Sequence, residues 1–297
     1  SPADIPWLTS VGASQHDRQW QAKGTDITAD GAATHADIRG VAFAAATGGA
    51  FPLVDAASLG SPKCLAPELA GQDLSGMIIL CERGTNGRVE KGQVVGDLGA
   101  EGMILGNDAA SGDSLNADAH ELPAVHITYA QAQELRAWMS GKTGVEVALS
   151  GGIRHVGDDV ADIMAGFSSR GPNRAISILS PSVSAPGVDI LAAEGADNEV
   201  KWSFLSGTSM ASPHTAGALA LVAAVQPDWT PAEVQSALMT TAETAVKDTD
   251  GTDADWHDMG SGRIDLTKVA KAGLVFDTTY AQYVAANPAS GGDVRQL

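Results

Sequence analysis

The segment from Ser209 to Val225 constrains the fold most strongly, because it is apolar along nearly its whole length. A helix built from it would be narrow, so that neighbouring elements could approach it closely on all sides. The residues that make it narrow are alanines: Ala211, Ala216, Ala218, Ala220, Ala223 and Ala224. The sequence therefore predicts a buried helix over 209–225, ended by Gln226-Pro227.

A second helix is predicted to begin immediately afterwards. Thr230 suits the N-cap, Pro231 suits the first helical position, and Glu233 suits the third position of a capping box.

Length and charge limit the function classes. At 297 residues the chain is about twice the usual ~150-residue domain, which predicts two domains. The 36 Asp and Glu residues exceed the 18 Lys and Arg residues, which leaves a net charge of −18. Such a surface repels phosphate backbones and anionic lipids, so we expect neither nucleic acid nor a membrane as a partner. No apolar run of about 18 residues predicts a membrane span, and the first residues do not resemble a signal peptide.

The region from about 22 to 151 is typical of a compact α/β module, because predicted strands and helices follow one another there. The expected strands are 77–81, 103–105 and 123–127, and the expected helices are 88–98 and 129–139. A short strand at 7–11, ended by Gly12, is predicted before this region. The polar stretch from there to Gly40 predicts short exposed strands and turns.

Cys64 and Cys81 are the two cysteines of the sequence. If they are oxidised their pairing is unique, and closing a loop of that length would stabilise the fold by roughly 3 kcal/mol. Two buried free thiols are the alternative.

The most informative string runs from Ser206 to His214 and reads SGTSMASPH. It predicts a glycine-containing turn that delivers the Ser209 hydroxyl to the first turn of the buried helix. There the Ser209 N–H is an unpaired donor that can stabilise an oxyanion, and the helix N-terminus favours nearby negative charge. A simple N-cap is the alternative role for Ser209.

This string resembles the nucleophile motif of the subtilisin-like serine proteases (subtilases). The segments GFSSRGP (166–172), APGVDILAA (185–193) and MGSGRID (259–265) resemble other segments of that family, in the same order. The stretch from Cys64 through CERG (81–84), Lys91, GAEGMILGN (99–107) and LPAVHI (122–127) is similar to an inserted protease-associated (PA) domain, in which the two cysteines pair.

The resemblance implies a fold class and a domain order. The fold would be α/β, a partial subtilisin-like core of parallel sheet and helices with an inserted α/β PA domain. We expect a core strand in 1–21, the PA domain in 22–151, the C-terminal part of the catalytic domain in 152–276, and a linker in 277–297. The chain would be the C-terminal half of a secreted, extracellular serine endopeptidase that forms an acyl-enzyme at Ser209.

The other catalytic parts of the family have no match here. A subtilase triad runs Asp, His, Ser, and the D-[ST]-G and H-G-T segments are missing, as is the oxyanion asparagine. The nearest similar residues, Asp30-Gly31 and His35-Ala36, fall inside the inserted module. His214 follows Ser209 by five residues, which turns it to another face of the helix. The other histidines have no supporting motif: His16, His35, His120, His126, His155 and His257.

We therefore expect the chain alone to be inactive. Its expected partners are the missing N-terminal part of the same protease and, as substrates, proteins or peptides. A non-enzymatic PA-domain interaction module is the alternative.

No cofactor is required by this chemistry, and structural calcium is the remaining candidate. Its weak candidate ligands alternate along one loop: Asp248, Asp250, Asp253 and Asp255. The loop lacks the bidentate glutamate of an EF-hand, which favours a solvated acidic loop and no metal site.

Overall fold

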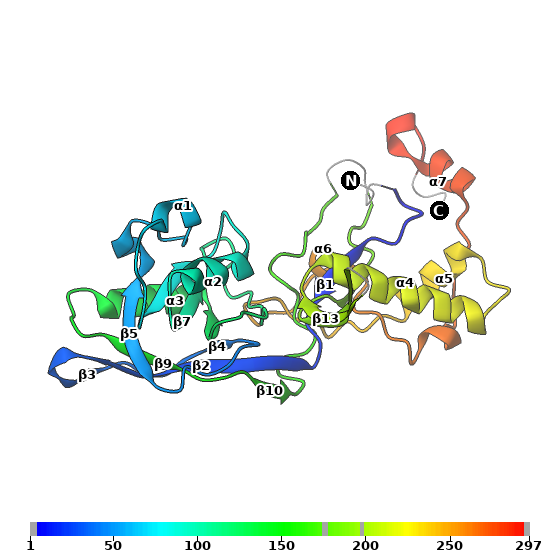
Figure 1. The fold of residues 1–297 in the computed structure, drawn as a ribbon. Helices are drawn as coiled ribbons and strands as arrows, with labels where there is room; N and C mark the ends of the chain where they lie inside the picture. Colours follow the sequence, from blue (N-terminus) through cyan, green and yellow to red (C-terminus); the bar gives the residue numbers. More distant parts are fainter. Residues whose placement is uncertain (1–4, 174–177, 197–198, 294–297) are drawn as a thin grey trace. The chain divides into compact units, whose positions relative to one another are not determined.

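The chain forms two compact units in the computed structural model, which describes residues 5–173, 178–196 and 199–293 (Figure 1). The first, called here the helix unit, comprises Ser1–Asp17, Asp158–Ile190 and Leu205–Leu297. The second, called the barrel unit, comprises Arg18–Gly157 and Leu191–Phe204. Both parallel strands and helices are present, so the α/β fold class predicted from the sequence is confirmed.

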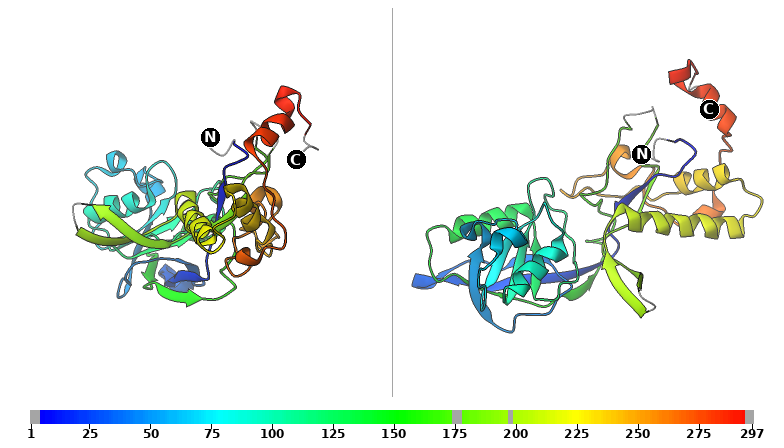
Figure 2. Two further views of the ribbon diagram at one scale, coloured as in Figure 1. Left: turned by 90° about the vertical axis from the view of Figure 1, so that its right-hand side faces the viewer. Right: turned by 45° about the horizontal axis from the view of Figure 1, so that its top comes forward.

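The helix unit is built on one parallel strand pair, β1 (Val11–Ser14) with β11 (Val183–Pro186). Against it packs α4 (Thr208–Val225), with α5 (Pro231–Thr240) alongside (Figure 2). The shorter helices are α6 (Trp256–Met259) and α7 (Tyr280–Ala286), with 3-10 turns at Val269–Lys271 and Pro288–Ser290. Ala13, Val183, Ala185 and Ala211 form the centre of the core and are almost completely buried.

The barrel unit closes seven strands into a ring. The strands are β2 (Arg18–Ala29), β4 (Ile38–Val41), β8 (Ala124–Ile127), β7 (Gly102–Gly106), β6 (Ile78–Glu82), β5 (Ala50–Asp55) and β9 (Glu146–Leu149), and β9 pairs again with β2. β3 (Ala33–Thr34) and β10 (Ile153–Val156) add to β2, while β5 to β8 run parallel.

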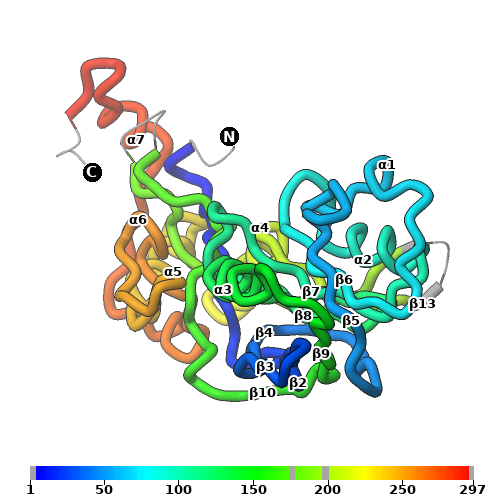
Figure 3. The backbone as a smooth tube through the Cα atoms, turned by 90° about the vertical axis from the view of Figure 1, so that its left-hand side faces the viewer, coloured from blue at the N-terminus to red at the C-terminus, as the bar shows by residue number. Residues whose placement is uncertain are grey.

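In its described residues the barrel unit also contains three helices and two 3-10 turns, and Figure 3 labels the helices. They are α1 (Ala66–Leu69), α2 (Arg88–Asp97), α3 (Tyr129–Met139), and the turns Asp30–Ala32 and Ala56–Leu59. A separate two-stranded ribbon, β12 (Ile190–Ala196) with β13 (Glu199–Leu205), follows β11 in the chain.

Strand β6 is apolar at successive positions because both of its faces are buried. Ile78 and Leu80 belong to the core that includes α3, whereas Ile79 and Cys81 belong to the core that includes α1 and α2. Because successive side chains point to opposite faces of a sheet, a strand buried on both faces has no polar positions.

Most predicted elements are confirmed within one or two residues. The helix predicted at 129–139 is α3, and the helix predicted at 209–225 is α4. The capping box before α5 is also present, because Thr230 Oγ accepts from the Glu233 N–H at 3.2 Å and Glu233 Oε2 accepts from the Thr230 N–H at 2.8 Å.

Two predictions at the N-terminal end are wrong. The strand expected at 7–11 is β1 at Val11–Ser14, and Gly12 lies within it and does not end it. A side chain at Gly12 would come within 3.2 Å of Met164 and 3.3 Å of Ser168, so this glycine serves close packing. The short exposed strands expected before Gly40 are instead dominated by the twelve-residue β2, which buries Ile27 among other residues.

A disulfide joins Cys64 to Cys81, the pairing that the resemblance implied. Both cysteines are fully buried, in the core between the sheet and α1 and α2. We predict that thiol titration in denaturant without reductant finds no free thiol. Reduction should lower the free energy of unfolding by about 3 kcal/mol, because it restores the loop entropy of the unfolded chain.

Two free thiols in freshly purified protein would contradict this prediction. Unchanged stability after complete reduction would show that the crosslink does not restrict the unfolded state.

His126 organises a buried polar network in the barrel unit. Its Nε2 lies 2.7 Å from Asn107 Oδ1, and its Nδ1 accepts from the Asn116 N–H at 3.1 Å. Complete burial lowers the pKa of His126 to about 3, so the ring is neutral, with its proton on Nε2. Asn107 in turn donates to the carbonyls of Gly112 and Ser114, which fixes the loop after β7.

This burial predicts acid sensitivity. Between about pH 6.5 and 3 the unfolded chain binds a proton at His126 that the folded chain excludes, so stability falls as the pH falls through this window. The slope contributed by this residue is at most about 1.4 kcal/mol per pH unit. We predict that His126→Gln is less stable than the parent at pH 7. The gap should narrow by about 1 kcal/mol at pH 5.5, measured by urea unfolding. A gap that stays constant would mean that His126 titrates normally in the folded state.

Candidate active site

Ser209 is the second residue of α4 and is exposed. The helix begins at Thr208, and the N-cap is Gly207, which has extended backbone angles and makes no side-chain cap. The N-cap role considered for Ser209 from the sequence is therefore wrong. The Ser209 N–H instead lies among the first amides of the helix, which lack intrahelical partners.

The turn before Ser209 is held by its neighbour Ser206. The Ser206 hydroxyl accepts from the Asp189 N–H at 2.8 Å and donates to the Asp189 carboxylate at 3.0 Å. One residue later, the Gly207 N–H donates to the Gly187 carbonyl at 2.7 Å. These contacts tie the turn at 206–209 to the loop that follows β11.

Gly187 lets this loop lie against the turn at 206–209. A side chain there would approach Ala13 Cβ to 2.7 Å and the Gly207 carbonyl to 2.8 Å. The Gly187 N–H also donates to the Ser14 carbonyl at 2.8 Å. The sequence alone did not predict that Ser206 and Asp189 are partners. Their pairing depends on the contact between the turn at 206–209 and the loop after β11.

Ser209 lines a cavity of about 500 Å³ within the helix unit. The lining is small and uncharged: Leu8, Thr9, Ser10, Val11, Ser169, Ser180, Pro181, Thr208, Ser209, Ser212 and Pro213. Among the residues that the structure describes, this lining supplies hydroxyl groups but neither an acid nor a base.

In the described ranges no histidine is hydrogen-bonded to Ser209. The His214 Nδ1 lies 2.9 Å from the Met210 carbonyl of its own helix. His16 Nε2 lies 3.4 Å from the Asp189 carbonyl, and His257 belongs to α6. The remaining four are residues of the barrel unit: His35, His120, His126 and His155. Asp30 is also in that unit, where it accepts from Thr143 Oγ1 at 2.8 Å.

Only one stripe of α4 is buried within the described chain. The buried residues, Ala211, Thr215, Ala218 and Val222, follow the helical spacing of three and four. On other faces Leu221 and Val225 are each 60% exposed. A helix that is apolar all round is stable when all its faces are covered, so α4 presents an apolar surface that suits a further packing partner.

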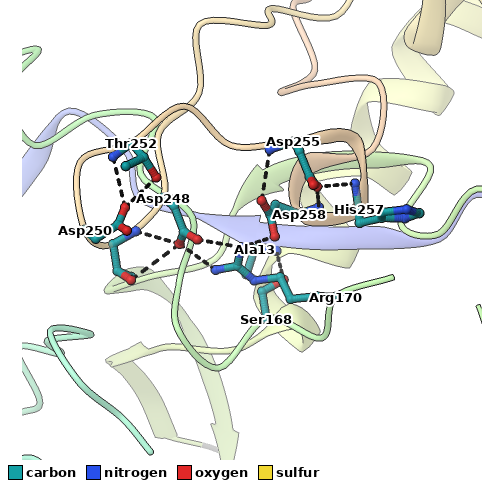
Figure 4. Close-up of polar contacts among 10 residues, drawn as sticks. Ala13, Ser168, Arg170, Asp248, Asp250, Thr252, Asp255, His257 and Asp258 are labelled. Carbon is teal, nitrogen blue, oxygen red and sulfur yellow. Dashed lines mark hydrogen bonds and ion pairs between the residues drawn. The ribbon is translucent and has the colours of Figure 1, made fainter. Parts of the chain in front are cut away.

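The four candidate calcium ligands each have a separate protein partner, and three of them, Asp248, Asp250 and Asp255, are labelled in Figure 4. Asp248 pairs with Arg170 at 2.8 Å, and Asp253 pairs with Lys247 at 2.5 Å. Asp250 accepts from Thr252, and Asp255 caps α6. Within the described ranges no group of three or more His, Cys, Asp or Glu side chains is placed to hold a metal ion.

Arg170 is the centre of this region. Its guanidinium binds both Asp248 and Asp258, while Ser168, two residues earlier, accepts from the Ala13 N–H at 3.0 Å (Figure 4). Burial would raise the pKa of Asp248, but hydrogen bonds from Arg170 and from the Thr249 N–H together hold it below its ordinary value. Arg170 therefore links the acidic loop to the segment that supports β1.

We predict that Arg170→Met lowers the free energy of unfolding by about 2 kcal/mol, because two partly buried carboxylates lose their cation. The matched control is Lys247→Met, which removes a cation from an ion pair whose Asp253 side chain is 86% exposed. That loss should be much smaller, because water and salt screen an exposed ion pair. Urea unfolding measures both, and equal losses would contradict the central role of Arg170.

Comparisons with known proteins find similarity to subtilisin-like proteases. A sequence profile of the subtilase family matches residues 1–262. Subtilisin-like protease SBT1.6 of Arabidopsis thaliana is 36% identical over 303 residues, which are 94% of this chain and 39% of that protein. Subtilisin-like protease SBT1.3 of the same plant is 37% identical over 306 residues, covering 94% of this chain and 38% of that protein. The chain thus spans about two fifths of the length of these relatives. No helix in its described ranges is long and apolar enough to cross a membrane.

Proposed function

Because this chain belongs to the subtilase family, we propose that Ser209 is the nucleophile of a serine endopeptidase. The observation that carries this proposal is the position of Ser209, exposed in the first turn of α4 beside a cavity, after a turn fixed by hydrogen bonds. In the reaction, Ser209 Oγ attacks the scissile carbonyl carbon of a protein or peptide and the amine leaves, which gives an acyl-enzyme that water hydrolyses.

The proposed mechanism needs three groups besides Ser209. A histidine takes the Oγ proton and later gives it to the leaving amine, an aspartate orients that histidine, and an asparagine joins the Ser209 N–H in binding the oxyanion. We propose that these groups come from polypeptide outside the 297 residues. The uncharged lining of the Ser209 cavity supports this, as does the engagement of His214 with the Met210 carbonyl.

The exposed face of α4 is the proposed seat of that polypeptide. Leu221 and Val225 are exposed here, and covering them would remove apolar surface from water at the same helix that carries the nucleophile. The chain alone would then be an inactive C-terminal half, in which the catalytic domain continues through 152–276 and a linker follows at 277–297.

The barrel unit is the proposed PA domain, inserted after a core strand in 1–21 and centred on 22–151. It has its own two cores and its own disulfide. This independence also supports the second candidate function, a non-enzymatic module that binds proteins. The disulfide and the net charge of −18 favour a secreted, extracellular protein that binds neither nucleic acid nor membranes.

We predict that a fluorophosphonate probe does not label Ser209 in this chain, because a serine hydroxyl without a base is a weak nucleophile. Loss of the serine or the histidine of subtilisin lowers turnover by about 10⁶-fold, so residual activity should be undetectable. Ser209 should become labelled when the chain is expressed together with the upstream part of its protease.

Ser209→Ala is the control and should abolish labelling and proteolysis in the complete protease. Strong labelling of the isolated chain that depends on Ser209 would overturn the proposal and identify one of its own histidines as the base.

A further inference from the structure

The turn before α2 in the barrel unit contains the one Asn-Gly pair of the sequence, Asn86-Gly87. Such a pair is reactive, because the backbone nitrogen of a glycine, which carries no side chain, can approach the amide carbon of the asparagine and attack it. The turn is also tight, since the Asn86 N–H donates to the Gly84 carbonyl at 2.9 Å and Thr85 between them has a φ of 67°. A β-branched residue rarely adopts this left-handed conformation, and backbone outliers of this kind cluster at functional sites.

A buried cation contacts the side-chain carbonyl of Asn86. Lys91 of α2 is fully buried, and its Nζ donates to Asn86 Oδ1. The same Nζ donates to the carbonyls of Lys63 at 2.5 Å and Gly84 at 2.9 Å, which hold it in place. A hydrogen bond from a cation withdraws electrons from the carbonyl carbon and stabilises the negative charge that develops on the oxygen when a nucleophile adds. Lys91 is therefore placed to promote attack on the Asn86 side chain.

A carboxylate contacts the nitrogen that would attack. The Gly87 N–H donates to Glu90 Oε2 at 3.3 Å, and Glu90 is the third residue of α2. A carboxylate in this position can take the amide proton while the nitrogen forms its new bond, which is general base catalysis. The two reacting groups of the Asn-Gly pair thus each contact a charged side chain, Glu90 at the nitrogen of Gly87 and Lys91 at the carbonyl of Asn86.

The surroundings of Lys91 favour a carboxylate at position 86. The three acceptors of Nζ are neutral oxygens, and burial together with the nearby charge of Lys63 lowers the pKa of Lys91 to about 8. The Asn86 Nδ2 atom is buried and has no hydrogen-bond partner among the described residues, which is unfavourable. Replacing this amide by a carboxylate would remove the unpaired donor and place an opposite charge beside the buried ammonium group.

From these features we propose that Asn86 is a site of deamidation that the fold itself promotes. The Gly87 nitrogen forms a bond to Asn86 Cγ while its proton passes to Glu90, and Lys91 stabilises the charge on the oxygen. The bond from Cγ to the side-chain nitrogen then breaks, and that nitrogen takes the proton from Glu90 and leaves as ammonia. A water molecule opens the resulting cyclic imide, so that residue 86 becomes aspartate or isoaspartate with a carboxylate close to Lys91.

Peptide mapping by mass spectrometry during incubation at neutral pH tests the proposal. Asn86 should deamidate faster in the folded chain than in the same chain unfolded in guanidinium chloride with its disulfide intact, because unfolding removes Lys91 and Glu90 from the turn. Glu90→Gln keeps an oxygen that can accept from the Gly87 N–H but removes the base, and it should slow the reaction at least about tenfold. Gly87→Ala should also slow it, because the new Cβ crowds the attacking nitrogen while it stays 3.7 Å from Glu90 Cβ, an ordinary contact that the fold tolerates.

The matched control is Glu101→Gln, which neutralises an exposed carboxylate of the same unit outside this turn. It should change the deamidation rate less than about twofold. Asn86→Asp reproduces one product and should unfold at a higher urea concentration than the parent, because its carboxylate pairs with Lys91. Faster deamidation in the unfolded chain, equal rates in Glu90→Gln and Glu101→Gln, or a lower urea midpoint for Asn86→Asp would each overturn the proposal.

Discussion

The close packing of α4 on the parallel pair β1 and β11 is the contact on which the candidate site depends. Ala13, Ala185 and Ala211 are almost completely buried there, and Gly187 leaves too little space for a side chain. Small residues allow the backbones to approach, and that approach allows the Gly207 N–H to reach the Gly187 carbonyl. The position of Ser209 therefore depends on small residues elsewhere in the helix unit, namely Ala13, Ala185 and Gly187.

The same helix has a second side that is exposed to solvent, and this exposed side supports the proposal of an incomplete catalytic centre. Burying Ala211, Thr215, Ala218 and Val222 satisfies one stripe, while Leu221 and Val225 face solvent. One proposal therefore accounts for two features. Further polypeptide that packs on α4 would cover its exposed side and would also supply the histidine and the aspartate. The barrel unit needs no such addition for its own core, because its ring of strands closes on itself.

The sequence predicted those parts of the fold that local chemistry determines. The capping box of Thr230 and Glu233 identified the start of α5, and the apolar run IILC identified β6. Prediction failed where a distant contact decides. Gly12 suggested the end of a strand, but its contacts with Met164 and Ser168 make it an internal strand residue.

Strand pairing also exceeded what the sequence could indicate. The opposition of Lys23 and Arg39 depends on the register of β2 and β4 and has no signal in either segment alone. In the site, the motif predicted Ser209 and its helix, but the pairing of Ser206 with Asp189 required the loop after β11 to be in place. The four aspartates from 248 to 255 suggested a calcium site because their spacing is visible in the sequence. The ion pair of Arg170 with Asp248, which occupies one of them, is visible only in the structure.

Hydrogen exchange of the α4 amides, residues 208–225, tests the central claim most directly. If α4 is covered only on one side, its amides should exchange faster in this chain than those of β6 and β7, which are buried on both faces. Adding the upstream part of the protease should then slow exchange in α4 and leave β6 and β7 unchanged. Protection of α4 equal to that of β6 and β7 in the isolated chain, with no change on addition, would contradict the account.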